Sequence, residues 1–363
     1  MWHFANPGNW TPTSLVRATA QGAHTLLDHG VGAFFALQRT RRSDDYLRNI
    51  HSDVLAGIEL YERLGWLEDA SLAHTDPGPP ETVEIVEVDR AGGYEQLSFA
   101  SAYTPHPEDP SGARWQSLRE NRTVHAFMLR HPEPRPWVVN VHGAGMGNVS
   151  ADLLAFRSRQ LFEQGVNVIH PVLPLHGPRR SSERAHYPSE SLMHNVHGAL
   201  QGTSDVRRVL AWIRQTQPGQ PIGVHGISLG GFTTGLVASL EPDLACAILG
   251  VPPVDLVLLL QAHHGRGQDN DMREQNFEVG ARLSHMLTPL KLKPAIPHER
   301  RFIYAGVVDQ LVDYADHVAP LVAHWDYPEV LVFDGGHVGV GLSRAVPRFV
   351  RDALRSSGVL PPD

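Results

Sequence analysis

Cysteine is almost missing from this chain of 363 residues, in which Cys246 is the single thiol. One thiol excludes a disulfide within the chain and a metal site built from several thiolates. Long apolar runs are missing too: the most apolar early stretch, residues 31–37, is far shorter than the roughly 20 residues of a membrane-spanning helix. The first residues lack a basic cluster followed by an apolar segment, so we expect no secretion signal, no transmembrane segment and a cytoplasmic location.

An excess of positive charge is also missing. Lys and Arg number 31 against 39 Asp and Glu, which gives a formal net charge of −8. Proteins that bind nucleic acids neutralise phosphates with basic residues, so no nucleic-acid partner is expected, and the short basic run at residues 39–42 does not change this. Hydrophobic residues make up 42% and charged residues 19%, the composition of a folded globular protein.

Proline and the spacing of apolar residues divide the chain into two parts. Residues 1 to about 75 have a helix-like pattern, which the proline-rich stretch at 76–80 ends. We therefore expect an N-terminal helical extension over 1–80 and a second domain over 81–363. From residue 82 apolar and polar residues alternate, which predicts the strands 82–88, 94–103 and 123–129.

After Pro136, short unbroken apolar runs alternate with helical periods, a pattern typical of parallel strands buried on both faces. The runs predict strands at 137–141, 166–169, 221–224, 245–249, 302–305 and 330–333. The periods between them predict one helix from Ser150 to Gly165, another that begins at Ser204, a third over 229–240 and a C-terminal helix. This alternation implies a mostly parallel, doubly wound α/β sheet.

One connection is much longer than the others. Roughly fifty residues separate the strand at 245–249 from the next strand, whereas connections in α/β units have about two to six. We expect a lid insertion over about 253–298, above the carboxyl edge of the sheet. Its apolar run 256–260 either lines an acyl pocket or forms the core of the lid, and residues 263–278 mix charge with glycine and predict a solvated loop.

The sequence Gly226-Ile-Ser228-Leu-Gly230 fits the pattern G-x-S-x-G. By composition alone this match is weak, but here it follows an apolar strand and opens a helix. In that context it predicts a tight turn that exposes the Ser228 hydroxyl above the sheet, because glycine allows backbone to pass where a Cβ would clash.

A serine hydroxyl becomes a good nucleophile only when a base removes its proton and a carboxylate orients that base. Asp309 and His337 each lie in a loop directly after a predicted strand. Carboxyl ends of parallel strands meet at one edge of a sheet, so these side chains are expected near Ser228. The chain order Ser228, Asp309, His337 is that of α/β-hydrolases.

On these residues the chain resembles the α/β-hydrolase superfamily over roughly residues 120 to 358. The resemblance implies a serine hydrolase with the triad Ser228, Asp309 and His337 and no cofactor. Asp255, which follows the strand at 245–249, is an alternative acid, because some members of the superfamily place the acid one strand earlier. The segments 174–180 (PLHGPRR) and 335–339 (GGHVG) resemble a little-characterised branch of abhydrolase-domain proteins.

Attack on a carbonyl creates an oxyanion that two backbone donors must stabilise. The first donor is expected to be the amide of Leu229, directly after the nucleophile. The second is expected from the loop at 142–145 (HGAG), where Ala144 is the donor that the resemblance implies. The alternative is that this glycine-rich stretch only turns the chain. Its spacing does not fit the dinucleotide-binding pattern G-x-G-x-x-G.

Histidine is frequent in one stretch, at positions 170, 176, 186, 194 and 197. His194 and His197 share a helix face, yet zinc needs a third protein ligand and supporting partners that the sequence does not supply, so no metal site is expected. Two arginines in the same region, Arg179 and Arg180, either bind an anionic substrate group or form a loop ion pair with Glu183 or Glu190.

The sequence therefore predicts a serine esterase that cleaves a small-molecule carboxylic ester, lipid-like esters included, through an acyl-enzyme. Two alternatives stay open. Gly231 extends the motif to G-x-S-x-G-G, which also occurs in prolyl-peptidase-like peptidases, and a hydrolase fold can serve as a non-catalytic binding protein. Peripheral membrane contact through residues 26–37 is a further hypothesis.

Overall fold

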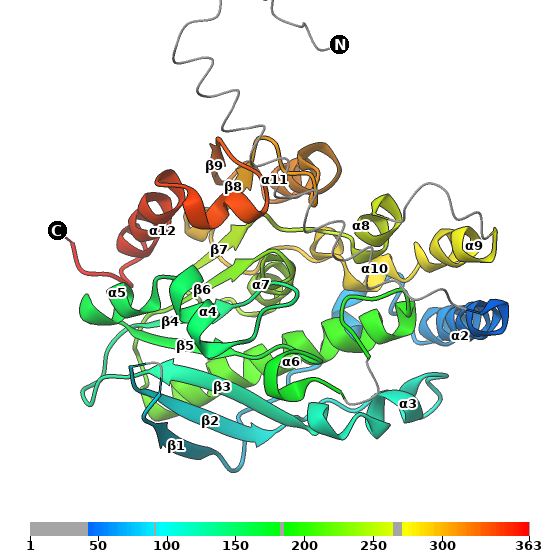
Figure 1. Cartoon of the computed structure of the whole chain (residues 1–363), viewed down its shortest axis with the longest axis horizontal. Helices are drawn as coiled ribbons and strands as arrows, with labels where there is room; N and C mark the ends of the chain where they lie inside the picture. The colour runs from blue at the N-terminus through cyan, green and yellow to red at the C-terminus, as the bar shows by residue number, and fades with distance from the viewer. Residues whose placement is uncertain (1–42, 91, 182–184, 264–270, 363) are drawn as a thin grey trace, which may run out of the picture.

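The computed structural model describes residues 43–90, 92–181, 185–263 and 271–362. Its centre is a sheet with the strand order β1-β2-β3-β5-β4-β6-β7-β8-β9 (Figure 1). The strands are β1 (Glu84–Val88), β2 (Tyr94–Ala100), β3 (Thr123–Leu129), β4 (Trp137–Val141), β5 (Asn167–Pro171), β6 (Ile222–Ile227), β7 (Cys246–Gly250), β8 (Arg301–Gly306) and β9 (Glu329–Phe333). β1, β2, β3 and β5 pair antiparallel in that order, and all neighbours from β5 to β9 are parallel. The predicted fold class is confirmed.

Helices cover both faces of this sheet. They are α2 (Asp44–Arg63), α3 (Gly112–Ser117), α4 (Val149–Ala155), α5 (Ser158–Glu163), α6 (Leu192–Thr216), α7 (Leu229–Leu240), α8 (Leu256–Ala262), α9 (Asp271–Gly280), α10 (Ser284–Leu287), α11 (Ala319–His324) and α12 (Ala345–Ser356). The short turns are η2 (Ala70–Ala73), η3 (Arg119–Arg122), η4 (Gly177–Arg179), η5 (Pro289–Lys291), η6 (His298–Arg300), η7 (Tyr314–Val318) and η8 (Val338–Leu342). Among the described helices, none is both long and apolar enough to cross a bilayer.

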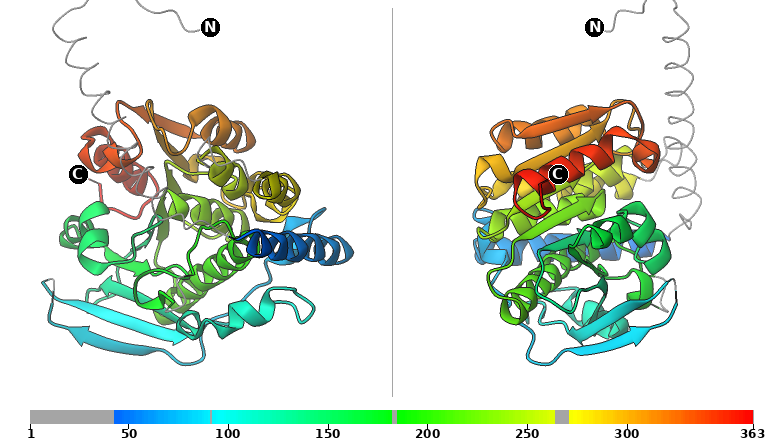
Figure 2. Two further views of the ribbon diagram at one scale, coloured as in Figure 1. Left: turned by 45° about the vertical axis from the view of Figure 1, so that its right-hand side comes forward. Right: turned by 90° about the vertical axis from the view of Figure 1, so that its left-hand side faces the viewer.

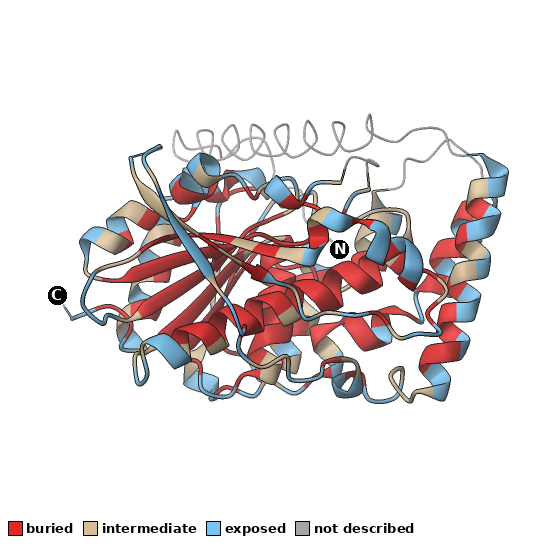
Figure 3. Cartoon of the chain, turned by 90° about the horizontal axis from the view of Figure 1, so that it is seen from below, coloured by how far each residue is buried: buried red, intermediate tan, exposed pale blue. Residues whose placement is uncertain are grey.

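The core lies on both sides of the central strands. In β4, Val138 packs in a cluster with side chains of α5 and α12, and its neighbour Val139 packs in another with side chains of α6 and α7. Successive side chains of a strand point to opposite faces, so both faces of β4 are covered. Figure 3 shows the central strands and α6 as buried. This double cover explains why these strands are mostly apolar.

The helix predicted from Ser204 begins twelve residues earlier, at Leu192. Residues 192–203 include two glycines and two histidines, which are weak helix formers. Packing overrides this weakness: a Cβ at Gly198 would lie 2.5 Å from the Tyr187 ring, so the glycine is what lets that ring lie against the helix. The single helix predicted from Ser150 is also wrong. Asn148 caps α4, and Arg157, with a φ of 50°, separates α4 from α5.

The solvated loop predicted at 263–278 is wrong in its second half, because α9 begins at Asp271; residues 264–270 lie outside the described part. α9 packs beside α2, far away in sequence (Figure 2), and buries Phe277. The boundary near residue 80 and the lid over 253–298 stay predictions. Residues 26–37 and 39–42 lie outside the described residues.

Candidate active site

Ser228 is the single residue between the end of β6 and the start of α7. Its φ is 57° and its ψ is −119°, a conformation that residues with a Cβ rarely adopt and that costs on the order of 1–3 kcal/mol. Two backbone hydrogen bonds hold it there: the Ser228 amide donates to the Gly250 carbonyl (2.8 Å), and the Ser228 carbonyl accepts from the Phe232 amide (3.0 Å). Strained residues that are held in this way cluster at functional sites.

The glycines of the motif are required by close backbone approach. A Cβ at Gly226 would lie 2.1 Å from the Gly230 carbonyl oxygen, and a Cβ at Gly230 would lie 1.9 Å from the Val141 carbonyl oxygen. Both distances are far below any real contact, so only glycine fits at either position. The strand β6 runs three residues beyond its predicted end at 224, into the motif itself.

The three residues predicted for nucleophile, base and acid lie in one line of hydrogen bonds. His337 Nε2 is 2.9 Å from Ser228 Oγ, and His337 Nδ1 is 2.8 Å from Asp309 Oδ2. The other carboxylate oxygen, Oδ1, accepts from the amides of Leu311 (2.9 Å) and Val312 (2.8 Å). The Asp309 side chain is 3% exposed and the His337 side chain 12%, so the ring separates the carboxylate from solvent.

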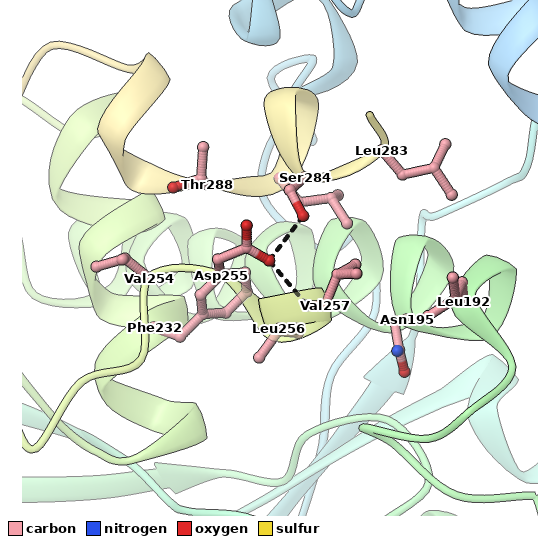
Figure 4. A pocket seen from close by; sticks show the side chains of 11 residues that line it. Leu192, Asn195, Phe232, Val254, Asp255, Leu256, Val257, Leu283, Ser284 and Thr288 are labelled. Carbon is pink, nitrogen blue, oxygen red and sulfur yellow. Dashed lines mark hydrogen bonds between the residues drawn. The ribbon is translucent and has the colours of Figure 1, made fainter. Parts of the chain in front are cut away.

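Asp255, the alternative acid, is engaged elsewhere. Its Oδ1 accepts from the amides of Val257 (2.8 Å) and Leu258 (3.0 Å), which caps α8, and from the Ser284 hydroxyl (2.7 Å). Figure 4 shows this carboxylate between α8 and α10. Asp255 therefore links α8 to α10, and Asp309 is the carboxylate that contacts His337.

The apolar run 256–260 forms most of α8. Leu256 and Val257 line a cavity together with Phe232 of α7 and Leu283 beside α10 (Figure 4). The volume of this cavity is about 10 Å³, room for a single water at most. Of the two interpretations of the run, the structure thus favours packing within the segment over an open acyl pocket.

The glycine-rich loop after β4 lies against the nucleophile. A Cβ at Gly143 would be 3.3 Å from the Cβ of Ser228, and the Gly143 carbonyl accepts from the Met146 amide (3.2 Å). Ala144 follows Gly143 in this turn. Directly after Ser228 in the chain, Leu229 is the first residue of α7, and the first amides of a helix have no partner within the helix.

Two side chains that sequence reasoning missed support this loop. His142 is fully buried; its Nε2 accepts from the Leu173 amide (3.0 Å), so Nδ1 carries the hydrogen and donates to the Gly143 carbonyl (2.8 Å). Burial holds the pKa of His142 well below 6.5, which keeps the ring neutral. Asp152 accepts from the Gly147 amide (3.3 Å), and burial raises the pKa of this carboxyl to about 7.

Among the described residues, the partners of Arg179 differ from those that the sequence suggested. Its side chain is fully buried and donates to Asp205 Oδ2 (2.8 Å), to the Val172 carbonyl (2.8 Å) and to the Asn121 carbonyl (2.9 Å). Glu190 instead contacts Arg273, and Glu183 lies outside the described residues. Arg180 is exposed. Two of these partners, Asp205 on α6 and Asn121 before β3, are far away in sequence, so no local pattern could have revealed them.

The histidines that lie close together in the sequence make separate polar contacts in the structure. His170 bonds to the Ser158 hydroxyl (2.8 Å), and His197 contacts the hydroxyls of Tyr103 (2.8 Å) and Ser111 (2.7 Å). The part of the chain that the structure describes contains no group of three His, Cys, Asp or Glu residues placed to hold a metal ion.

Comparisons with known proteins agree with this architecture. A family profile described as "alpha/beta hydrolase domain containing 18" matches residues 107–254. Two uncharacterized proteins, from two strains of Mycobacterium tuberculosis, are each 44% identical over 315 residues, which is 86% of this chain and 76% of theirs. An acetyl xylan esterase from Paenibacillus sp. R4 shares the fold, with a TM-score of 0.52 at 14% identity over 84% of this chain and 94% of that one. Residues 107–254 thus match a family of α/β-hydrolase domains, and the chain has the α/β-hydrolase fold.

Proposed function

We propose that this protein is a serine hydrolase that cleaves carboxylic esters through an acyl-enzyme on Ser228. The observation that supports this most is the continuous line of hydrogen bonds from Ser228 Oγ through His337 to Asp309, at a strained turn between strand and helix. In this arrangement one imidazole nitrogen faces the nucleophile while the other is fixed by a buried carboxylate.

The proposed reaction has two halves. In the first, His337 Nε2 takes the proton from Ser228 Oγ as Oγ bonds to the ester carbonyl carbon, and the amides of Leu229 and Ala144 stabilise the oxyanion. Collapse of this intermediate breaks the bond to the alcohol oxygen, which takes the proton from Nε2. In the second half, a water molecule loses a proton to His337 Nε2 and attacks the acyl carbon. The bond from this carbon to Ser228 Oγ then breaks, Oγ takes the proton back from Nε2, and the carboxylic acid leaves.

Asp309 orients the ring in both halves. Its Oδ2 accepts the hydrogen on Nδ1, which leaves Nε2 free of hydrogen and able to accept the serine proton. When Nε2 is protonated, the carboxylate stabilises the imidazolium. No cofactor takes part in this scheme.

The test combines covalent labelling with a substrate series. A fluorophosphonate probe should label the wild type and Ser117→Ala, an exposed serine in α3 whose hydroxyl donates to the Arg114 carbonyl, but not Ser228→Ala. Nitrophenyl acetate and butyrate should be hydrolysed, and aminoacyl anilides should not. A wild type that neither labels nor turns over an ester overturns the proposal, and faster cleavage of the anilides assigns a peptidase instead.

A further inference from the structure

Arg179 and the loop after β4 are joined by a chain of hydrogen bonds that passes through one peptide group. The guanidinium Nη1 of Arg179 donates to the Val172 carbonyl (2.8 Å). The amide of the same peptide group belongs to Leu173, and it donates to His142 Nε2 (3.0 Å). The buried arginine thus acts on the imidazole of His142 through a single planar unit.

The chain continues through a second peptide group. His142 Nδ1 donates to the Gly143 carbonyl (2.8 Å), and the amide of that peptide group is the Ala144 N–H. In a trans peptide the carbonyl and the N–H point in opposite directions. Holding the Gly143 oxygen on the His142 side therefore fixes the direction of the Ala144 N–H, the proposed second oxyanion donor.

A second contact couples the same two segments. A Cβ at Gly177 would lie 2.3 Å from the Gly147 carbonyl oxygen, so the segment before Arg179 packs directly on the loop at 142–147. Arg179 also donates to the Asn121 carbonyl and to Asp205, which anchors this segment to the body of the domain.

We propose that Arg179 is a positioning residue for the oxyanion site, acting through Val172, His142 and Gly143 on the Ala144 amide. This inference rests on the proposed function, because it needs Ala144 to be the second donor. Donors in such a chain polarise one another, by about 10–30% per bond, and fixed direction is what makes an oxyanion donor effective.

The expected effect is a loss in kcat rather than in KM, because the oxyanion forms only in the transition state. Removal of an oxyanion donor itself costs roughly 100- to 1000-fold. Arg179 acts only on the direction and polarity of that donor, so we expect a smaller loss, about 10-fold.

The variant must avoid leaving a buried unpaired charge, which costs about 3–5 kcal/mol. Arg179→Met/Asp205→Asn removes both charges together and keeps an acceptor for the Ser101 hydroxyl, which bonds to Asp205. The matched control is Arg207→Met/Glu241→Gln. Arg207 is likewise buried, and it donates to Glu241 (2.6 Å) and to the carbonyls of residues 74 and 75, away from the loop at 142–147.

The assay measures kcat and KM for nitrophenyl acetate, binding of a phenylboronic acid that forms a tetrahedral adduct on the serine, and thermal melting. In Arg179→Met/Asp205→Asn, kcat and boronate affinity should each fall about 10-fold with KM within about 2-fold of the wild type. The pH at which kcat/KM is half-maximal should not move, since His337 is untouched. The control pair should melt earlier with kcat unchanged.

A folded Arg179 double variant with wild-type kcat, or an equal loss in the control pair, overturns the inference. If the double variant does not fold, the single variant Arg179→Lys tests the inference in its place. Lysine keeps the charge beside Asp205 but lacks the planar group that reaches both carbonyls, so kcat should still fall, and wild-type kcat overturns the inference. An inactive wild type refutes the proposed function itself, which is a different result from an active wild type with unaffected variants.

Discussion

Asp309→Asn is expected to slow ester hydrolysis by about 10,000-fold at neutral pH, and the structure explains why the change acts through a single proton. Asp309 Oδ1 accepts from the amides of Leu311 and Val312, and Oδ2 accepts from His337. An asparagine in this place keeps its oxygen toward the two backbone amides, so its NH₂ group faces His337 Nδ1. Nδ1 must then accept, the hydrogen moves to Nε2, and Nε2 can no longer take the proton of Ser228.

The size of the effect depends on whether the side-chain amide of the asparagine can flip and exchange the positions of its oxygen and its NH₂ group. Turning its NH₂ group toward the amides of Leu311, which is half-buried, and Val312, which is buried, leaves two donors unsatisfied, at up to about 1–3 kcal/mol each. The asparagine therefore holds His337 in the tautomer that carries its hydrogen on Nε2. A 10,000-fold loss corresponds to about 5 kcal/mol in the activation barrier.

The chain offers a matched control four residues further on. Asp313 Oδ1 accepts from the amides of Ala315 (2.8 Å) and Asp316 (3.1 Å), the same turn geometry without a histidine on the other oxygen. In a nitrophenyl butyrate assay with melting curves, Asp309→Asn should be nearly inactive and fully folded, and Asp313→Asn should match the wild type. Activity of Asp309→Asn within 10-fold of the wild type, or an equal loss in Asp313→Asn, refutes the reasoning.

Two further changes test the turn and the loop. Gly230→Ala forces a Cβ to 1.9 Å from the Val141 carbonyl and should lower the free energy of unfolding by at least about 3 kcal/mol in urea titrations, whereas Gly341→Ala, with open space around it, should not. Burial raises the Asp152 pKa to about 7, so the folded state binds this proton more tightly than the unfolded state, and the stabilisation present at pH 4 is lost as the pH rises through 7. Asp152→Asn keeps the acceptor for the Gly147 amide and should remove this loss, up to about 4 kcal/mol between pH 4 and pH 8; an unchanged pH dependence of unfolding contradicts this account.

The sequence by itself determined the parts of this protein that local backbone chemistry controls. Strands buried on both faces are mostly apolar, so the bounds of β4 could be predicted to the residue although the strand includes Asn140. Only glycine tolerates the contacts at 226 and 230, so the tight turn around Ser228 was visible in the motif. The loops of Asp309 and His337 followed from the strands before them.

Tertiary structure decided which distant side chains meet. Asp255 and Asp309 both follow strands, and only the packing of α8 against α10 gives Asp255 its own hydroxyl partner. The start of α6 depended on Tyr187 packing on Gly198, and the role of Arg179 depended on peptide groups before β3 and after β5. Local propensity acts over a few residues, whereas these contacts exist only after the chain has folded segments far apart in sequence against one another.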